Sequence, residues 1–325
     1  MIYGQIKGLD KNISGVIMGC SKLRSDIHGI EGSMKLYDTA YENGINTFDT
    51  AAVYGDSECV IGKWIESKSK TDPALREKTV VITKGAHHSK YRKRVTPYDI
   101  LSDIHESFAK TKLSYFDIYL LHKDDPEFPV GPVMDTLNRL RDEGKIKIFG
   151  VSNWMHNRIE EANNYALKHH LEPIRVSSPN FTLGKPNKEF FKDSATLSGD
   201  GEALDWYKKT QLPVFSYSAL AKGFFGGIIK SEDKADAENI LGKVIYDAGK
   251  SLYEIMANEH NFEVLAELEK QAEAARSTVA QAALKKLAES PFPVYPIFFS
   301  SKPERIIAAA NAFNQPPRFS PRVSP

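Results

Sequence analysis

Short apolar runs recur along the chain, and the intervals between them leave room for helices. The runs are rich in β-branched and aromatic residues. Several are almost continuously apolar, which is typical of strands buried on both faces of a parallel sheet. The eight predicted strands are Gly15–Gly19, Ile45–Asp49, Val80–Thr83, Phe116–Leu121, Ile148–Val151, Ile174–Val176, Pro213–Ser216 and Val294–Phe298.

Helical patterns with recognisable ends lie between these runs. Proline suits the first position of a helix, and glycine suits the position just after its end. The predicted boundaries are an N-cap at Thr96 before Pro97, a helix over 34–43 that ends at Gly44, a helix over 132–143 that ends at Gly144, and a helix start at Pro303.

Eight strands that alternate with helices, without a break in composition, predict a single-domain α/β fold, the (β/α)8 TIM barrel, over residues 1–325. An open, doubly wound sheet is the competing arrangement. Residues 1–13 predict a small β-hairpin that caps the N-terminal end of the barrel. The interval before the last strand is long, and its polar segment 231–249 is interpreted as a surface insertion.

Composition narrows the class of protein. The chain has 325 residues, of which 41% are hydrophobic, and a formal net charge of +1. This near-neutral charge argues against a nucleic-acid surface, which needs an excess of Lys and Arg. We find no run of apolar residues long enough for a membrane span. Two cysteines, Cys20 and Cys59, favour a reducing cytoplasm over a disulfide framework.

Four polar residues stand at or just beyond the predicted strand ends, where parallel barrels carry their chemistry. Asp49, Lys84 and His122 end or follow three strands, and Tyr54 lies on the loop beyond Asp49. Alone, a strand-end Asp is often an N-cap and a lone His is often a hydrogen-bonded core residue. Together at one end of a barrel, the four residues predict a catalytic site.

The four residue types make chemical sense as a proton donor. A tyrosine with a pKa of about 10 is a poor acid at neutral pH, and a nearby Lys84 ammonium is expected to lower the pKa of Tyr54. A buried Asp49 would hold that ammonium, and His122 would orient a carbonyl oxygen. Positive charge behind the donor would stabilise a developing alkoxide. Hydride from a reduced nicotinamide would serve as the missing nucleophile.

The segments around these residues resemble the aldo-keto reductase family over nearly the whole chain. The most specific segments are GINTFDTAAVYGDSE (44–58), VVITKG (80–85), FDIYLLH (116–122), LRDEGKIKIFGVSNW (140–154) and FSYSALAKG (215–223). The resemblance implies that Tyr54 is the general acid–base, supported by Asp49, Lys84 and His122. It also implies a cofactor extended across the top of the barrel, and the chain has no Gly-x-Gly-x-x-Gly after a strand.

The resemblance further assigns cofactor contacts, with NADP(H) favoured and NAD(H) as the alternative. Ser152 and Asn153 would bind the nicotinamide amide, and Tyr217 would stack on its ring. Ser300 and Arg305 would surround a 2′-phosphate, a suitable task for a guanidinium. The other implied cofactor contacts are Gly19, Cys20, Asp49, Ser178 and, around the pyrophosphate, Ser218, Leu220, Lys222 and Gly223.

The chain departs from the family pattern near both ends of the expected cofactor. Ser178 stands where the family usually has a glutamine near the nicotinamide. Phe299 takes the place of a Lys or a small residue, and Ala308 and Ala309 stand where other members have Glu and Asn facing the adenine. These departures bear on how strongly the adenine end of the cofactor is bound and on how strongly NADPH is preferred over NADH.

The substrate is expected to be a small carbonyl or alcohol compound, with sugar-like compounds among the candidates. Tyr54, His122 and Trp154 are the predicted substrate contacts, and His87 and His88 would favour an anionic or polyhydroxylated substrate. The sequence leaves monomer and homo-oligomer both open.

Two other functional classes compete with the enzyme. One is a cofactor-binding redox sensor or regulatory subunit, resembling potassium-channel beta subunits. The other is a metal- or carboxylate-dependent hydrolase, built on the acidic residues that follow His122. We predict no metal site, because tight ligand spacing is missing.

Overall fold

The computed structural model describes residues 1–245 and 249–314. Eight parallel strands form a closed barrel in the order β10-β3-β4-β5-β6-β7-β8-β9. The strands are β3 (Ile17–Gly19), β4 (Thr47–Asp49), β5 (Val80–Gly85), β6 (Phe116–Leu121), β7 (Ile146–Ser152), β8 (Val176–Ser178), β9 (Val214–Ser216) and β10 (Val294–Phe298). The predicted TIM barrel is confirmed, and the open sheet is wrong.

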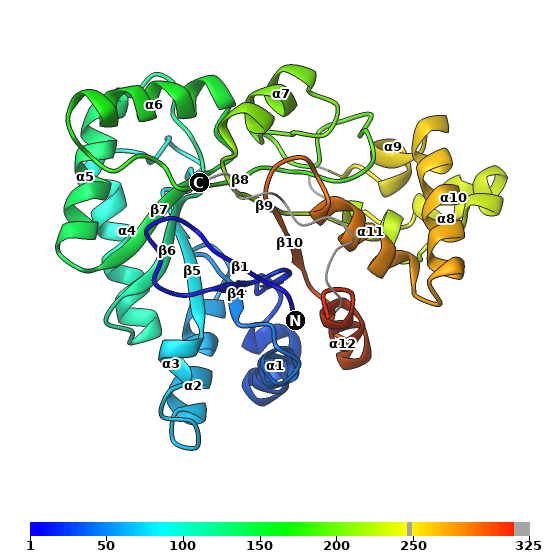
Figure 1. The fold of residues 1–325 in the computed structure, drawn as a ribbon, viewed down its shortest axis with the longest axis horizontal. Helices are drawn as coiled ribbons and strands as arrows, with labels where there is room; N and C mark the ends of the chain where they lie inside the picture. Colours follow the sequence, from blue (N-terminus) through cyan, green and yellow to red (C-terminus); the bar gives the residue numbers. More distant parts are fainter. Residues whose placement is uncertain (246–248, 315–325) are drawn as a thin grey trace.

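Helices alternate with the strands and surround the barrel (Figure 1). They are α1 (Ser25–Glu42), α2 (Ser57–Lys68), α3 (Leu75–Lys78), α4 (Pro97–Thr111), α5 (Val130–Asp142), α6 (His156–Lys168), α7 (Gly201–Thr210), α8 (Ala237–Leu241), α9 (Leu252–Met256), α10 (Glu259–Ala274), α11 (Val279–Ala288) and α12 (Pro303–Asn311), with 3-10 turns η1 (Ala221–Gly226) and η2 (Ser231–Asp236).

The predicted helix boundaries hold where a capping residue marks them. The Thr96 side chain accepts a hydrogen bond from Asp99 N at the start of α4. Gly44 and Gly144 follow α1 and α5 with φ of 88° and 72°, the left-handed conformation in which glycine ends helices. Helix α1 begins at Ser25, nine residues before its predicted start at Met34, and is interrupted at Gly29.

The N-terminal hairpin closes the bottom of the barrel, as predicted. Strands β1 (Tyr3–Gly4) and β2 (Ile13–Ser14) pair antiparallel. Ile6 and Ile13 are buried in the same apolar cluster as the inward-facing residues Ile82, Ile118 and Ile148 of the barrel strands. Burial of these side chains excludes water from the N-terminal end of the barrel, opposite the carboxyl ends of the strands.

A second apolar cluster lies beside the barrel, where Figure 1 shows α8, α9 and α10 gathered on one side. The segment interpreted as an insertion, 231–249, contains η2 and α8, and its residues 246–248 lie outside the described residues. Ala237 and Leu241 of this segment pack into the cluster together with Leu265 of α10. The segment therefore helps to build a helical layer against η1 and α11.

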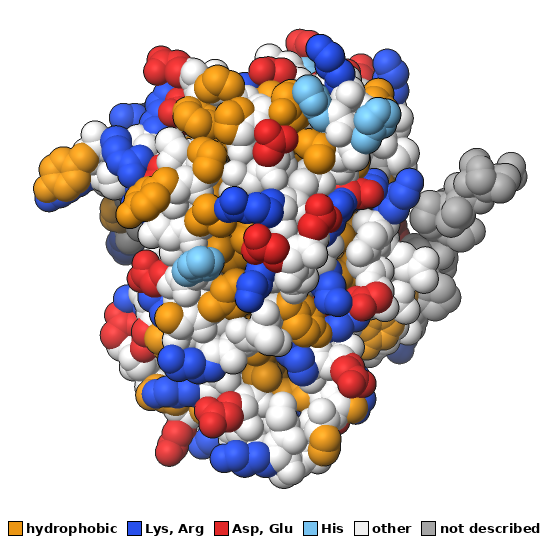
Figure 2. Space-filling view, turned by 90° about the vertical axis from the view of Figure 1, so that its left-hand side faces the viewer, with side chains coloured by type: hydrophobic (Ala, Val, Ile, Leu, Met, Phe, Trp, Pro, Cys, Tyr) orange, Lys and Arg blue, Asp and Glu red, His pale blue; other side chains and the backbone are white. Residues whose placement is uncertain are grey.

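The surface carries both signs of charge. On the face drawn in Figure 2, Lys and Arg side chains are intermixed with Asp and Glu side chains. This mixture agrees with the net charge of +1. In the described parts of the chain, no helix has the length and apolar character required to cross a membrane.

Candidate active site

The predicted catalytic side chains meet at the carboxyl end of the barrel. Asp49 is the last residue of β4, Lys84 is the next-to-last residue of β5, and His122 follows β6 directly. Tyr54 lies on the loop between β4 and α2. Because β4, β5 and β6 are neighbours in a parallel barrel, their ends reach the same rim and bring these side chains together.

The Lys84 ammonium joins the other groups. Its Nζ lies 2.7 Å from Asp49 Oδ1 and 2.8 Å from Oδ2. It also donates to Thr50 O at 2.9 Å and to the Tyr54 hydroxyl at 3.4 Å. Lys84 is 2% exposed and Asp49 4% exposed, so each charge depends on the other for compensation. Asp49 thus holds the Lys84 ammonium in place beside the Tyr54 hydroxyl.

The His122 ring lies against Tyr54. The two ring centroids are 5.6 Å apart in an edge-to-face arrangement. The backbone of His122 is fixed, because its N–H donates to Gly85 O at 2.8 Å and its carbonyl accepts from Asn153 Nδ2 at 2.9 Å. Its buried Nδ1 has no hydrogen-bond partner among residues 1–245 and 249–314. The imidazole is thus positioned by its backbone and by ring packing.

Burial sets the protonation states of the site. It raises the pKa of Tyr54, and the Lys84 charge opposes this rise without reversing it. The expected lowering of the Tyr54 pKa is therefore wrong for this site. Burial disfavours the charge on Lys84, but Asp49 and Tyr54 outweigh it and raise the Lys84 pKa. Burial, together with Lys84 and His87, holds the pKa of His122 well below its ordinary value. At neutral pH the site has a phenol, an ammonium and a neutral imidazole.

This arrangement can give a proton to an oxygen. The phenol of Tyr54 can act as the donor, and the Lys84 ammonium can stabilise the negative charge that develops as the proton leaves. Cys20 lines the same cavity, but burial raises the pKa of its thiol to about 12. A thiol that stays protonated is a poor nucleophile. The chemistry that the site supports is proton transfer.

A cavity of about 1230 Å³ opens above these residues. Pockets for drug-sized ligands usually have about 300–1,000 Å³, so this cavity has room for a dinucleotide together with a small substrate. All residues predicted for catalysis or for cofactor contact line it. They are Gly19, Cys20, Asp49, Tyr54, Lys84, His122, Ser152, Asn153, Ser178, Tyr217, Ser218, Leu220, Lys222, Gly223, Ser300 and Arg305.

The side chains expected near the nicotinamide form one hydrogen-bonded group. The Tyr217 hydroxyl donates to Asn153 Oδ1 at 2.7 Å, which fixes the aromatic ring predicted to stack on the cofactor. Ser152 Oγ donates to Ser178 O at 2.7 Å. Ser178 Oγ donates to Phe215 O at 2.9 Å, so its hydrogen is used within the barrel.

The turn from Ser218 to Gly223 lines the cavity with a tightly folded backbone. Ser218, Ala221 and Lys222 adopt left-handed φ angles of 54°, 46° and 56°, and Gly223 follows with 109°. The N–H groups of Ala221 and Gly223 are used within the turn, where they donate to Ser218 O at 2.7 Å and to Leu220 O at 2.9 Å. The Lys222 ammonium lies 4.4 Å from the centroid of the Phe191 ring across the turn. Lys222 also lines the cavity, and its positive charge suits a pyrophosphate.

The far end of the cavity is formed by α11 and α12. Ser300 Oγ accepts from Lys302 N at 3.1 Å beside the start of α12, and Gln281 Nε2 donates to Ala308 O at 2.9 Å. The Arg305 side chain is exposed and has no hydrogen bond or ion pair with the described residues. An unpaired guanidinium at a helix start suits a phosphate. The residues present therefore fit a 2′-phosphorylated dinucleotide.

Comparison with known sequences agrees with the geometry. The sequence model of the aldo/keto reductase family matches residues 30–320. This chain belongs to the aldo/keto reductase family. As a member of the family the protein is an oxidoreductase.

Relatives of this aldo/keto reductase are distant. It is 24% identical to a putative voltage-gated potassium channel subunit beta of Schizosaccharomyces pombe, over 91% of this chain and 83% of that protein. It is 26% identical to an aryl-alcohol dehydrogenase [NADP(+)] of Phanerodontia chrysosporium, over 87% and 72% of the two chains. It is 25% identical to the aldo-keto reductase YhdN of Bacillus subtilis, over 64% and 58%. Relatives this distant do not fix a substrate.

One predicted substrate contact of the reductase does not reach the cavity. Trp154 is 1% exposed and is not among the residues that line it. Its Nε1 donates to Lys123 O at 3.1 Å, and the Arg158 guanidinium lies 5.4 Å from its ring centroid. Trp154 therefore packs beneath the rim, where it supports the loop after β6.

Part of the cavity wall was missed by the reasoning from sequence. Residues at the start of α11, including Thr278 and Gln281, line the cavity, and so does Ile228. The Thr278 and Gln281 side chains form a capping box, which the Thr-x-x-Gln spacing could have revealed as a helix start. That pattern does not say which surface the helix faces.

The acidic residues after His122 are engaged by cations. Arg158 Nε lies 3.5 Å from Asp124 Oδ1, and Lys93 Nζ lies 3.0 Å from Asp125 Oδ1. Burial raises the pKa of Asp124 to about 6. In the described parts of the chain, no group of three or more His, Cys, Asp or Glu residues is arranged to hold a metal ion. Asp124 and Asp125 thus form local ion pairs.

Proposed function

We propose that this aldo/keto reductase reduces an aldehyde or ketone to an alcohol with NADPH or NADH, and that Tyr54 is the general acid. The observation that carries the proposal is the contact of one buried ammonium, Lys84, with both Asp49 and the Tyr54 hydroxyl on the wall of the large cavity. Sugar-like carbonyl compounds are among the candidate substrates.

Each residue has a defined task in this reaction. A bound reduced nicotinamide supplies hydride for the carbonyl carbon. Tyr54 holds the carbonyl oxygen and gives it a proton, while Lys84 stabilises the phenolate that remains. The neutral His122 ring orients the same oxygen, and Asp49 keeps Lys84 charged and in position.

The direct test is a titration of the pure protein with NADPH and with NADH, followed by fluorescence, and then a screen of aldehydes, ketones and sugars for cofactor oxidation. The proposal expects saturable binding of at least one cofactor and turnover with at least one carbonyl class. Absence of binding for both cofactors would overturn it.

The pH dependence should be broad. We expect a constant kcat/KM for reduction between about pH 6.5 and about pH 10. Tyr54 must be protonated to act as the acid, and its raised pKa keeps it so across this range. His122 must be neutral, and its lowered pKa keeps it neutral throughout. Activity should fall only as the pH rises through the Tyr54 pKa or drops through the His122 pKa. Steady-state rates in a mixed buffer check this, and a decline centred near pH 8 would contradict it.

We propose that NADP(H) is the preferred cofactor and that Arg305 is one source of the preference. NAD(H) lacks the 2′-phosphate, so its binding should not depend on this guanidinium. We expect Arg305→Ala to weaken NADPH binding by about one to two decades, the scale of a charge-assisted contact, and to leave NADH binding unchanged. Ala308 and Ala309 offer no polar adenine contact, which argues for the smaller end of this range.

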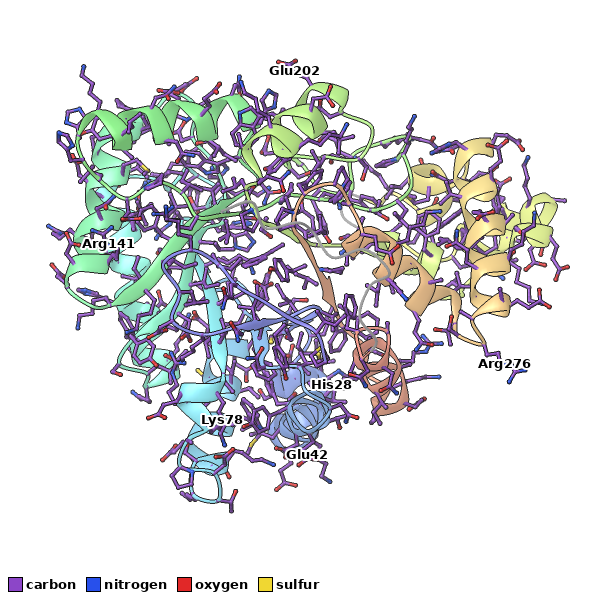
Figure 3. The ribbon with its side chains drawn as sticks, viewed as in Figure 1. His28, Glu42, Lys78, Arg141, Glu202 and Arg276 are labelled. Atoms are coloured by element: carbon purple, nitrogen blue, oxygen red, sulfur yellow. The ribbon has the colours of Figure 1, made fainter. Side chains whose placement is uncertain are left out.

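The matched control is Arg276→Ala. Figure 3 shows Arg276 projecting outward beyond the end of α10, and it is not among the residues that line the cavity. This variant should bind both cofactors as the parent does. Equal affinity of the parent for NADPH and NADH, or equal losses in Arg305→Ala, would show that Arg305 does not select the phosphate.

A second candidate function is a cofactor-binding sensor or regulatory subunit. It is favoured by the similarity over 91% of the chain to a protein named as a putative channel subunit beta. A sensor would keep its cofactor through purification and oxidise it once, with slow release. Steady-state turnover as fast as the first turnover would favour the enzyme.

We propose a cytoplasmic location, which is consistent with the two free cysteines. Its partner in the proposed reaction is a small carbonyl or alcohol compound.

A further inference from the structure

Two consecutive histidines after β5 stand on the cavity wall beside the catalytic residues. His87 and His88 both line the cavity and are only partly exposed. The His87 ring lies edge to face against His122, with ring centroids 4.9 Å apart. The catalytic His122 ring is thus flanked by Tyr54 and by His87. His87 therefore lies next to the part of the cavity wall that is expected to hold the carbonyl group.

Hydrogen bonds to backbone carbonyls fix the tautomers of both imidazoles. His87 Nδ1 lies 2.9 Å from His88 O, and His88 Nε2 lies 2.8 Å from Asp124 O. A carbonyl oxygen only accepts, so each of these ring nitrogens carries a hydrogen. In a neutral ring the other nitrogen, Nε2 of His87 and Nδ1 of His88, then has a lone pair. Neither nitrogen has a hydrogen-bond partner within the described part of the chain.

The surroundings of His88 favour its neutral ring. Burial lowers the pKa of His88, and the neighbouring His87 and Lys123 add to the effect. A neutral imidazole whose one N–H is already used has an acceptor nitrogen left for a ligand.

The loop that carries the histidines is held firmly. Asp103 Oδ2 accepts from Ala86 N at 2.7 Å, where Ala86 has a left-handed φ of 58°. Further along the loop, Arg92 binds Asp99 and Lys93 binds Asp125. A wall fixed in this way is preorganised for one kind of group.

We propose that His87 and His88 determine specificity by accepting hydrogen bonds from substrate hydroxyl groups. This inference rests on the proposed carbonyl reduction. The substrate class is then an aldehyde or ketone that carries hydroxyl groups on the carbons next to the carbonyl. A carboxylate brings no hydrogen for these lone pairs, so the wall selects a polyhydroxylated substrate over an anionic one.

The kinetic test compares substrates that differ by a single group. For the parent we expect a higher kcat/KM with lactaldehyde than with propanal, by about three- to tenfold, the scale of one neutral hydrogen bond. His87→Phe keeps an aromatic ring without a lone pair and should remove that preference, and His87→Gln should restore part of it. His105→Phe, at an exposed site on α4, is the matched control and should keep the parent ratio.

A second measurement does not depend on turnover. Nitrogen-15 NMR of the parent near neutral pH, with signals assigned from His87→Phe and His88→Phe, should show the Nδ1–H form for His87 and the Nε2–H form for His88. Adding threitol, a polyol that cannot be reduced, should shift the His87 Nε2 signal. If no carbonyl is reduced but these NMR results hold, the proposed reaction fails, while the proposal that His87 and His88 accept hydrogen bonds from hydroxyl groups stands.

Three results would overturn the inference. The first is an NMR spectrum that shows the opposite tautomers. The second is a lactaldehyde-to-propanal ratio of kcat/KM that is the same in the parent and in His87→Phe. The third is a succinate semialdehyde-to-butanal ratio of kcat/KM in the parent that exceeds its lactaldehyde-to-propanal ratio. The last result would assign an anionic substrate to the site.

Discussion

Tyr54→Phe is expected to lower kcat/KM for carbonyl reduction by about 10²–10⁴-fold, the contribution typical of a general acid. The substitution removes only the hydroxyl, which lies 3.4 Å from Lys84 Nζ, and keeps the ring that packs against His122. Because the hydroxyl acts on the substrate oxygen, cofactor affinity should stay within a few-fold of the parent. Steady-state rates and fluorescence titration measure the two quantities separately.

The control for this prediction is Tyr98→Phe, which removes a hydroxyl at a position 77% exposed on α4. It should leave both the rate and cofactor binding unchanged. Turnover of Tyr54→Phe within a few-fold of the parent would show that another group donates the proton.

Lys84→Met is expected to lower both stability and activity. It leaves Asp49 buried without its cation, and breaking a buried pair on one side typically costs about 3–5 kcal/mol of the free energy of unfolding. It also removes the charge that stabilises a Tyr54 phenolate. Denaturant unfolding measures the first effect and steady-state kinetics the second.

Adding Asp49→Asn to this variant separates the two effects. The double variant no longer buries an unpaired charge, so it should regain most of the lost stability while its activity remains low. Lys78→Met is the control, because the Lys78–Asp72 pair lies at the surface, where such pairs contribute about 0–1 kcal/mol. Parent-like activity in the double variant would contradict the role given to Lys84.

The barrel was predictable because its signal is local. Strands buried on both faces are continuous apolar runs, and each of the eight predicted runs overlaps a barrel strand. The overlap is smallest for Ile174–Val176, which shares only Val176 with β8. The beginning of α1 was missed because Gly29 and Gly32 interrupt the helical pattern, and Gly29 indeed has a non-helical φ of 68°. The capping residue Thr96 and the glycines after α1 and α5 marked their boundaries correctly.

The site was predictable only as far as strand ends determine it. Asp49, Lys84 and His122 meet because neighbouring parallel strands end at one rim. The start of α11 lines the cavity through packing of distant segments, which no local pattern contains. The direction of the Tyr54 pKa shift was predicted wrongly because residue types reveal the nearby ammonium but not the degree of burial that outweighs it.

The most direct test of the central claim follows the hydrogen that reaches the substrate. The protein is incubated with NADPH deuterated on one face of the nicotinamide C4, with an aldehyde that the screen identifies, and the product is analysed by mass spectrometry and NMR. The account predicts one deuterium at the carbinol carbon from one of the two C4 faces and none from the other, with a rate lowered in Tyr54→Phe. Product without cofactor deuterium from either face would contradict it.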